Sequence, residues 1–212
     1  MKTVPVASFV RHIAPMVDSA PDFAIRAAVV STIIDICRSA NCVTTQTCFT
    51  TKHGQHEYEI PLADGLKAEQ VRYVFCGGSP VHVKTMDEVY RQYEPMDFTS
   101  VSGTPLYYTF RSPDAIILTP APDKEYRVSL VVSVGIGRDA ENVPDIFYED
   151  FLDTVVYGAL SRLYKTAGQA FSNFRLAAEY EVLYRRGLGD IVSDSYRDFS
   201  RTQGRVRFQK VI

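Results

Sequence analysis

Tryptophan is absent from this sequence, cysteine is scarce, and no long apolar run is present. The 212 residues include 4 cysteines and carry a formal net charge of −2. No apolar stretch approaches the roughly 20 residues that a helix needs to span a bilayer. Because charges of opposite sign nearly balance, no global field draws the chain to nucleic acid or to a membrane surface. These absences count against a membrane-spanning protein, a disulfide-dependent fold and a strongly basic nucleic-acid binder.

The first twenty residues do not have the pattern of a signal peptide. Pro5 and Pro15 interrupt them, and they contain no continuous apolar core. We therefore expect assembly in the cytoplasm, where thiols stay reduced. On this interpretation the cysteines are buried small hydrophobes: Cys37, Cys42, Cys48 and Cys76.

Hydrophobic residues make up 46% of the chain, which is enough to bury a core in one large domain or two small ones. Helical periodicity occurs near the N-terminus. It predicts a short helix over residues 4–13 and a longer helix over residues 22–39. The apolar stripe of the longer helix is predicted to contain Phe23, Ala27, Val30, Ile34 and Cys37.

Two more helices are predicted after Pro144, which is tolerated in a first helical turn. The apolar stripe of the first contains Leu152, Val156, Ala159 and Leu163. Gly168 interrupts the pattern, Ser172 or Asn173 can cap the second helix, and Gly187 and Gly189 are predicted to end it. We expect these two helices and the N-terminal helices to form one helical core.

The middle of the chain changes to the two-residue periodicity of strands. Strands are predicted over residues 43–51, 56–62, 71–76, 81–83, 106–111, 115–118 and 126–134. Residues 53–55 and 77–79 are predicted turns, and Thr85 with Glu88 is predicted to cap a short helix that ends near Tyr93. The fold class is therefore α+β. The predicted domains are a helical domain (1–41 and 144–189), an inserted antiparallel β domain (42–143) and an extended C-terminal arm (190–212).

The arm combines positive charge with a few apolar residues. A solvated tail and a phosphate-binding segment are both consistent with the charge. Phosphate binding does not require apolar anchors, so we favour docking onto a protein partner. The candidate partner-binding residues are Arg197, Arg201, Arg205, Val206, Arg207, Phe208, Val211 and Ile212.

Motifs of catalysis and of metal binding are weak. Residues 135–140 match the dinucleotide fingerprint by letter, but no helix follows at once, which argues against a cofactor site. His53 and His56 could join Cys48 and Cys76 at zinc, yet no Cys-x-x-Cys pair accompanies them. We predict no catalytic, cofactor-binding or metal-binding residue.

Five segments resemble the head-to-tail adaptor proteins of tailed phages, especially of short-tailed ones. Three lie in the predicted C-terminal helices, at residues 156–163, 168–173 and 177–180. The other two are the strand-rich segments 103–109 and 116–123. These segments consist of packing and turn residues and carry no chemistry of their own. The likeness extends over roughly residues 20–187.

The resemblance implies a structural, non-enzymatic virion protein that forms a ring, dodecameric in such adaptors. Its partners would be the portal protein and a tail tube or nozzle protein, with non-specific contact to packaged DNA in the channel and no membrane contact. The ring would dock on the portal, extend the DNA channel and attach the tail. Two alternatives remain open: a small nucleic-acid-binding module that uses the basic arm, and a cytosolic enzyme.

Overall fold

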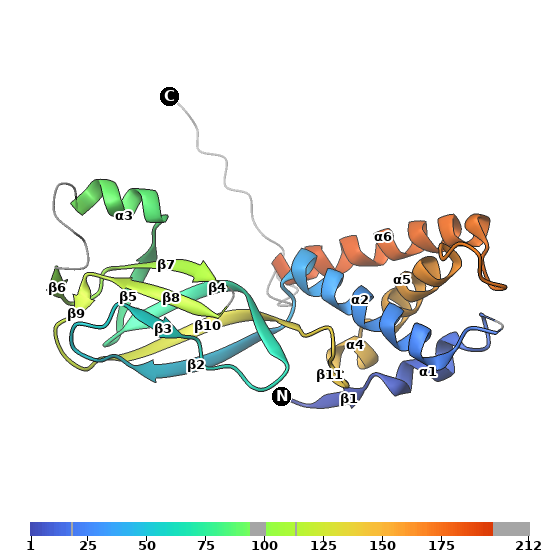
Figure 1. The fold of residues 1–212 in the computed structure, drawn as a ribbon, viewed down its shortest axis with the longest axis horizontal. Helices are drawn as coiled ribbons and strands as arrows, with labels where there is room; N and C mark the ends of the chain where they lie inside the picture. The colour runs from blue at the N-terminus through green and yellow to red at the C-terminus, as the bar shows by residue number, and fades with distance from the viewer. Residues whose placement is uncertain (18, 94–100, 113, 197–212) are drawn as a thin grey trace, which may run out of the picture. The chain divides into compact units, whose positions relative to one another are not determined.

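The structure is a computed structural model, and it describes residues 1–17, 19–93, 101–112 and 114–196. The chain divides into two compact units (Figure 1). The helical unit comprises Met1–Cys42 and Ala140–Ile212, and the β unit comprises Val43–Asp139. The α+β class predicted from the sequence is confirmed, with helices and a mostly antiparallel sheet in one chain.

The helical unit is formed by both ends of the chain. Its elements are β1 (Thr3–Pro5), α1 (Ala7–Ile13), α2 (Asp22–Ala40), β11 (Asn142–Pro144), α4 (Ile146–Glu149), α5 (Leu152–Tyr164) and α6 (Phe174–Tyr196). Helices α2, α5 and α6 contact one another, and α1 packs on α2 and α5 (Figure 1). The predicted helix over residues 4–13 is wrong at its start, because β1 pairs antiparallel with β11.

Helix α2 lies where the sequence predicts it but buries a different face. Ile25, Val29 and Ile33 are fully buried, whereas Phe23 is 75% exposed and Ile34 is only half-buried. The helix is apolar on most sides, so periodicity does not single out one face. The predicted stripe is therefore correct at Val30 and Cys37, which are buried, and wrong at Phe23, Ala27 and Ile34.

The two C-terminal helices are separated as predicted. Gly168 has a φ of 76°, which glycine adopts readily. Asn173 caps α6, because its side-chain Oδ1 accepts a hydrogen bond from the Leu176 N–H at 3.1 Å.

The stops predicted at Gly187 and Gly189 are wrong, because α6 continues to Tyr196. A Cβ on Gly187 would come within 2.3 Å of Oγ1 of Thr154 on α5. This glycine therefore permits close helix packing and does not end the helix. Residues 190–196, which we expected to begin the arm, are helical.

The β unit is organised around one curled sheet. Its elements are β2 (Thr44–Thr50), β3 (Glu57–Glu59), β4 (Leu66–Cys76), β5 (Ser79–Val83), α3 (Met86–Tyr93), β6 (Ser102–Gly103), β7 (Tyr107–Ser112), β8 (Ala115–Thr119), β9 (Ala121–Pro122) and β10 (Arg127–Ile136). Among the described residues, seven strands pair in the order β2-β10-β4-β5-β7-β8-β3, with only β5 and β7 parallel. Strands β6 and β9 form a separate parallel pair.

The predicted glycine turn and the predicted helix cap in this unit are confirmed, but one predicted strand pairing is wrong. Gly77 and Gly78 both have positive φ in the two-residue turn between β4 and β5, as a type I′ hairpin requires. Thr85 and Glu88 form the predicted cap: the Thr85 N–H donates to the Glu88 carboxylate at 2.7 Å, and the Glu88 N–H donates to Thr85 Oγ1 at 3.3 Å. The expected hairpin around residues 53–55 is wrong, because β2 pairs with β10 and β3 pairs with β8.

The core of the β unit lies inside the curl of the sheet. Leu118, Val128 and Leu130 are fully buried there. Phe49 of β2 stacks on Tyr58 of β3 with ring centroids 4.9 Å apart, so the two end strands of the sheet approach each other. We expected all four cysteines to be buried. Cys37, Cys42 and Cys76 are buried, but the prediction is wrong for Cys48, which is exposed on β2.

Candidate interaction surfaces

The residues predicted to bind a partner lie beyond the end of α6. Arg197, Arg201, Arg205, Val206, Arg207, Phe208, Val211 and Ile212 are outside the described residues. The structure therefore does not test them as a site. The last residue that the structure describes before them is Tyr196, in α6.

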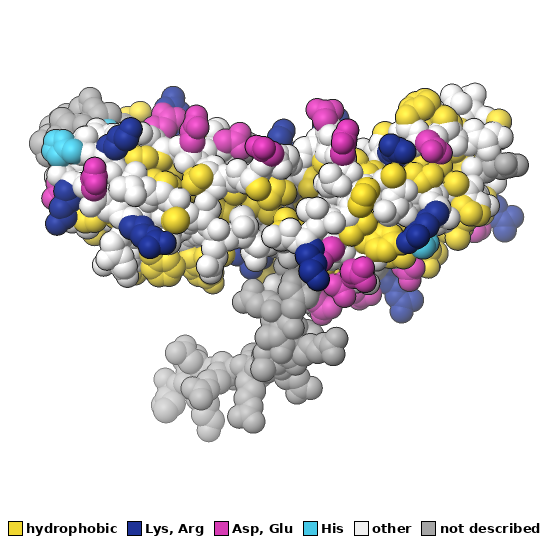
Figure 2. Space-filling view, turned by 90° about the horizontal axis from the view of Figure 1, so that it is seen from below, with side chains coloured by type: hydrophobic (Ala, Val, Ile, Leu, Met, Phe, Trp, Pro, Cys, Tyr) yellow, Lys and Arg dark blue, Asp and Glu magenta, His cyan; other side chains and the backbone are white. Residues whose placement is uncertain are grey.

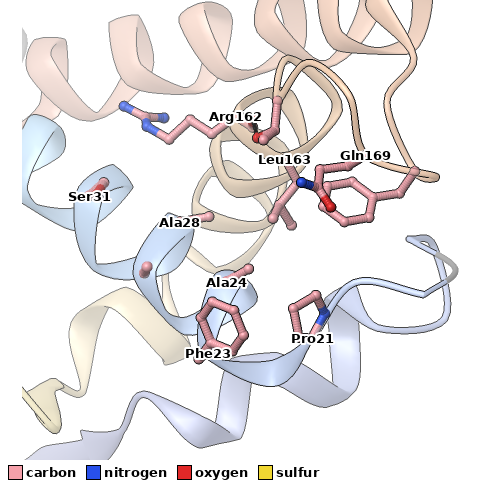
Figure 3. Close-up of a pocket in the computed structure, with 11 residues that line it drawn as sticks. Pro21, Phe23, Ala24, Ala28, Ser31, Arg162, Leu163 and Gln169 are labelled. Atoms are coloured by element: carbon pink, nitrogen blue, oxygen red, sulfur yellow. Dashed lines mark hydrogen bonds between the residues drawn. The ribbon is translucent and has the colours of Figure 1, made fainter.

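An apolar groove lies in the helical unit, between the N-terminal half of α2 and the end of α5 with the loop that follows (Figure 3). Its volume is about 460 Å³. Pro21 and Phe23 line one side, while Leu163 and Gln169 line the other. The groove remains open because the residues of α2 that face it are small: Ala24, Ala27, Ala28 and Ser31.

The sequence did not reveal this groove, since the periodic pattern placed Phe23 and Ala27 in the buried stripe. Both are exposed. The sequence did contain one signal of the groove, a cluster of small residues on one side of an apolar helix. It indicates where a helix can approach another segment closely, but not which segment. An exposed aromatic beside an open apolar groove is typical of a protein-binding surface.

Arg162 of α5 connects all three long helices of this unit. Its guanidinium donates to Thr32 Oγ1 at 3.1 Å and to the Gly158 carbonyl at 3.0 Å, and it pairs with the Asp35 carboxylate. It also lies over the ring of Tyr184 on α6, 5.4 Å from the centroid. These contacts fix α5 against α2 and α6 at one edge of the groove.

Glu181 of α6 is the centre of a second group of polar contacts in the helical unit, after that of Arg162. Its carboxylate accepts hydrogen bonds from Lys165 Nζ at 2.9 Å, Arg185 Nε at 2.8 Å and Ser161 Oγ at 2.9 Å. Lys165 and then Arg185 are the main causes that lower the pKa of Glu181 from 4.5 to about 2. The carboxylate therefore stays ionised in the folded protein well into the acid range.

We expect Glu181→Gln to remove part of the acid sensitivity of this protein. The pKa of Glu181 is lowered on folding, so its contribution to stability is present above about pH 4.5 and is lost as pH falls toward 2. The free energies of unfolding of wild type and variant should differ at pH 7 and converge as the pH falls from about 4.5 toward 2. Urea melts across this pH range measure the difference.

Glu179→Gln is the matched control, because Glu179 lies on the same helix and makes a single exposed pair with Arg175 at 3.2 Å. Such surface pairs contribute little, so this variant should follow wild type at each pH. A Glu181→Gln protein that keeps a constant stability difference from pH 7 to pH 2.5 would contradict the assignment.

The outer face of the β unit carries a second candidate surface. Tyr73 on β4 is 60% exposed, and Phe75 follows it on the same face. Val131 of β10 lies opposite Tyr73 in the ladder, and Ser129 lies between Phe75 and the exposed Cys48. Figure 2 shows hydrophobic side chains in yellow at the surface of the molecule, interspersed with charged ones. This face offers aromatic contacts to a partner.

The structure adds two observations on the motifs weighed above. The glycine-containing run, residues 135–140, begins within β10 and leads into β11, not into a helix. Within the part of the chain that the structure describes, no three His, Cys, Asp or Glu side chains are grouped to hold a metal ion. Across the same residues, no helix combines the length and the apolar character needed to cross a membrane.

The sequence matches a known protein family. The family model described as SU10 adaptor protein matches residues 5–207, which is nearly the whole chain. No curated protein matches the sequence. The family match supports the resemblance to phage head-to-tail adaptors, and it extends past α6 into the segment after Tyr196. This chain belongs to the SU10 adaptor protein family.

Proposed function

We propose that this chain is a structural virion protein that forms a ring-shaped head-to-tail adaptor, docks on the portal, extends the DNA channel and attaches the tail. The family match over residues 5–207 is the observation that carries this proposal. Membership of a family of phage adaptors favours a location in the virion and a non-enzymatic role.

Exposed apolar surfaces on both units support a function based on contact. The groove at Phe23 lies in the helical unit, and the aromatic face at Tyr73 lies in the β unit. An adaptor must bind several proteins, and a closed ring multiplies contacts that are individually weak. We propose a ring of identical copies, dodecameric as the family resemblance implies, with non-specific contact to DNA in its channel.

We assign the two units of the chain and its arm to different partners. The helical core, built from the N-terminal helices and the hairpin after residue 144, forms the portal-facing domain. The inserted β domain contacts neighbouring copies or the tail tube or nozzle. The arm beyond α6 binds the portal, with Phe208, Val211 and Ile212 as apolar anchors and the arginines pairing with acidic groups.

Removing the chain after Tyr196 tests this assignment. The shortened protein should stay folded, because the helices α2, α5 and α6 are retained, but it should lose binding to purified portal rings. Phe208→Ala should reproduce much of the loss, since truncating a buried aromatic anchor costs about 2 kcal/mol or more of binding free energy. Light scattering and sedimentation of mixtures with portal rings measure both effects.

Two outcomes would contradict the assignment. Unchanged portal binding by the shortened chain would show that the arm is not the docking element. A loss confined to DNA affinity, with steep salt dependence, would favour the nucleic-acid-binding alternative. A stable dimer that does not respond to portal would count against the ring itself.

A further inference from the structure

We infer that in the isolated subunit the groove beside Phe23 binds the apolar C-terminal segment of the same chain, residues 206–212. This inference concerns the free subunit and stands whether or not the proposed ring and portal docking are correct. It rests on the open groove, on the place where α6 ends and on the chemistry of the terminal residues.

The groove presents apolar surface with nothing of the described chain covering it. Phe23 is 75% exposed at one side, and Leu163 and Phe171 line the groove with it. Ser31, Thr166 and Gln169 place polar groups among these apolar side chains. A groove of this kind suits an extended segment, whose apolar side chains fill the floor while its backbone bonds to the polar groups.

The last turn of α6 is fixed at the far end of the same helix that forms the groove. Ser195 Oγ donates to the Ala40 carbonyl at 2.6 Å, at the C-terminal end of α2. Ala27 in the groove is 13 residues back along α2, which corresponds to about 20 Å at 1.5 Å per residue. The ten residues 197–206 can span roughly 33 Å when extended. Residues 206–212 can therefore reach the groove of their own chain.

The chemistry of the terminal segment matches the groove. Val206, Phe208, Val211 and Ile212 supply apolar side chains, and Arg207 and Lys210 supply positive charge. Asp22, which is exposed between the lining residues Pro21 and Phe23, offers a carboxylate to these cations. The hydrophobic match carries the argument, since the charged residue that lines the groove, Arg162, is itself a cation that pairs with Asp35.

The short linker between α6 and residues 206–212 favours binding of this segment to the groove of its own chain over binding to the groove of a second copy. A linker of this length holds the segment at an effective concentration on the order of millimolar near its own groove. At micromolar protein concentration a second copy cannot compete with that, even when the contact is weak. A partner that takes the segment would empty the groove, since one segment cannot occupy both places.

The absence of tryptophan provides a direct test. Phe208→Trp in the full chain introduces one tryptophan, whose emission should be blue-shifted and protected from iodide quenching. Ala27→Glu, added to this protein, should place a charge in the groove, shift the emission to that of a solvated tryptophan and raise the quenching constant several-fold. Ala178→Glu is the matched control, because Ala178 is an exposed alanine on α6 that does not line the groove.

Each result either supports or overturns the inference. A blue-shifted emission that is independent of protein concentration, abolished by Ala27→Glu and kept in Ala178→Glu supports it. A solvated emission in the Phe208→Trp protein, or a blue shift that survives Ala27→Glu, overturns it. A blue shift that appears only at high concentration, with a larger mass in light scattering, also overturns it by assigning the groove to a second copy.

Circular dichroism verifies that Ala27→Glu leaves the fold intact. If that variant does not fold, Phe23→Ser serves in its place, because Phe23 is exposed and its loss removes one wall of the groove without disturbing the core. The same red shift and greater quenching are then expected. An unchanged emission overturns the inference.

Discussion

Ile33→Asp is expected to unfold the helical unit. Ile33 is fully buried on α2, the helix that packs against α1, α5 and α6. An aspartate at this position would either bury a charge without a partner or force the helices apart, at a cost of more than about 3 kcal/mol. Far-UV circular dichroism during urea denaturation measures the loss, and insolubility on expression would agree with it.

The neighbouring residue provides a matched control that tests the rotation of α2. Ile34 is half-buried, so aspartate there can reach water and should cost only about 1 kcal/mol. The apolar stripe predicted from the sequence contains Ile34, and the structure places Ile33 in the core. Equal effects of the two variants, or a larger effect at Ile34, would contradict the observed face of the helix.

Gly158→Ala is expected to destabilise the helical unit even though alanine favours helices. A Cβ at this position of α5 would lie 2.4 Å from Cγ2 of Thr32 and 2.8 Å from Cδ2 of Tyr184. Thr32 and Tyr184 are buried residues on two other helices, so neither can move without disturbing the packing. The crowding, which typically costs about 1–3 kcal/mol, should outweigh the gain of up to about 1 kcal/mol in helix propensity.

Gly189→Ala is the matched control, because it makes the same substitution at a helix position that is not crowded. A Cβ there has no atom within 4 Å, and the position lies inside α6. This variant should gain about 0.5–1 kcal/mol, because alanine restricts the unfolded chain and favours the helix. Opposite signs for the two variants in urea melts are the expected result. A stabilising Gly158→Ala would show that the helices are not in close contact at that residue.

The aromatic face of the β unit could not be assigned from the pattern alone. Alternation in β4 shows that Val74 and Phe75 point to opposite sides, but not which side is the interior. Pairing with β10 settles this, because Val74 lies opposite the buried Leu130. The exposed position of Phe75 follows from a contact between residues far apart in the sequence.

The α+β class, most element positions and the local turns and caps could be predicted from the amino-acid sequence. Gly77–Gly78, the Thr85 cap and the Asn173 cap could be predicted because each depends on residues within a few positions. The family resemblance also came from the sequence. The partner-binding residues after Tyr196 stay a prediction.

The buried face of α2, the pairing of the strands and the position of the groove could be read only from the folded structure. Helix α2 is apolar on most sides, so its buried face depends on where α5 and α6 pack. Gly187 continues a helix that local rules would end, because α5 approaches too closely for a side chain. Strand β2 pairs with the distant β10 and not with β3, its neighbour in the sequence. These features depend on packing between distant segments, which local periodicity does not encode.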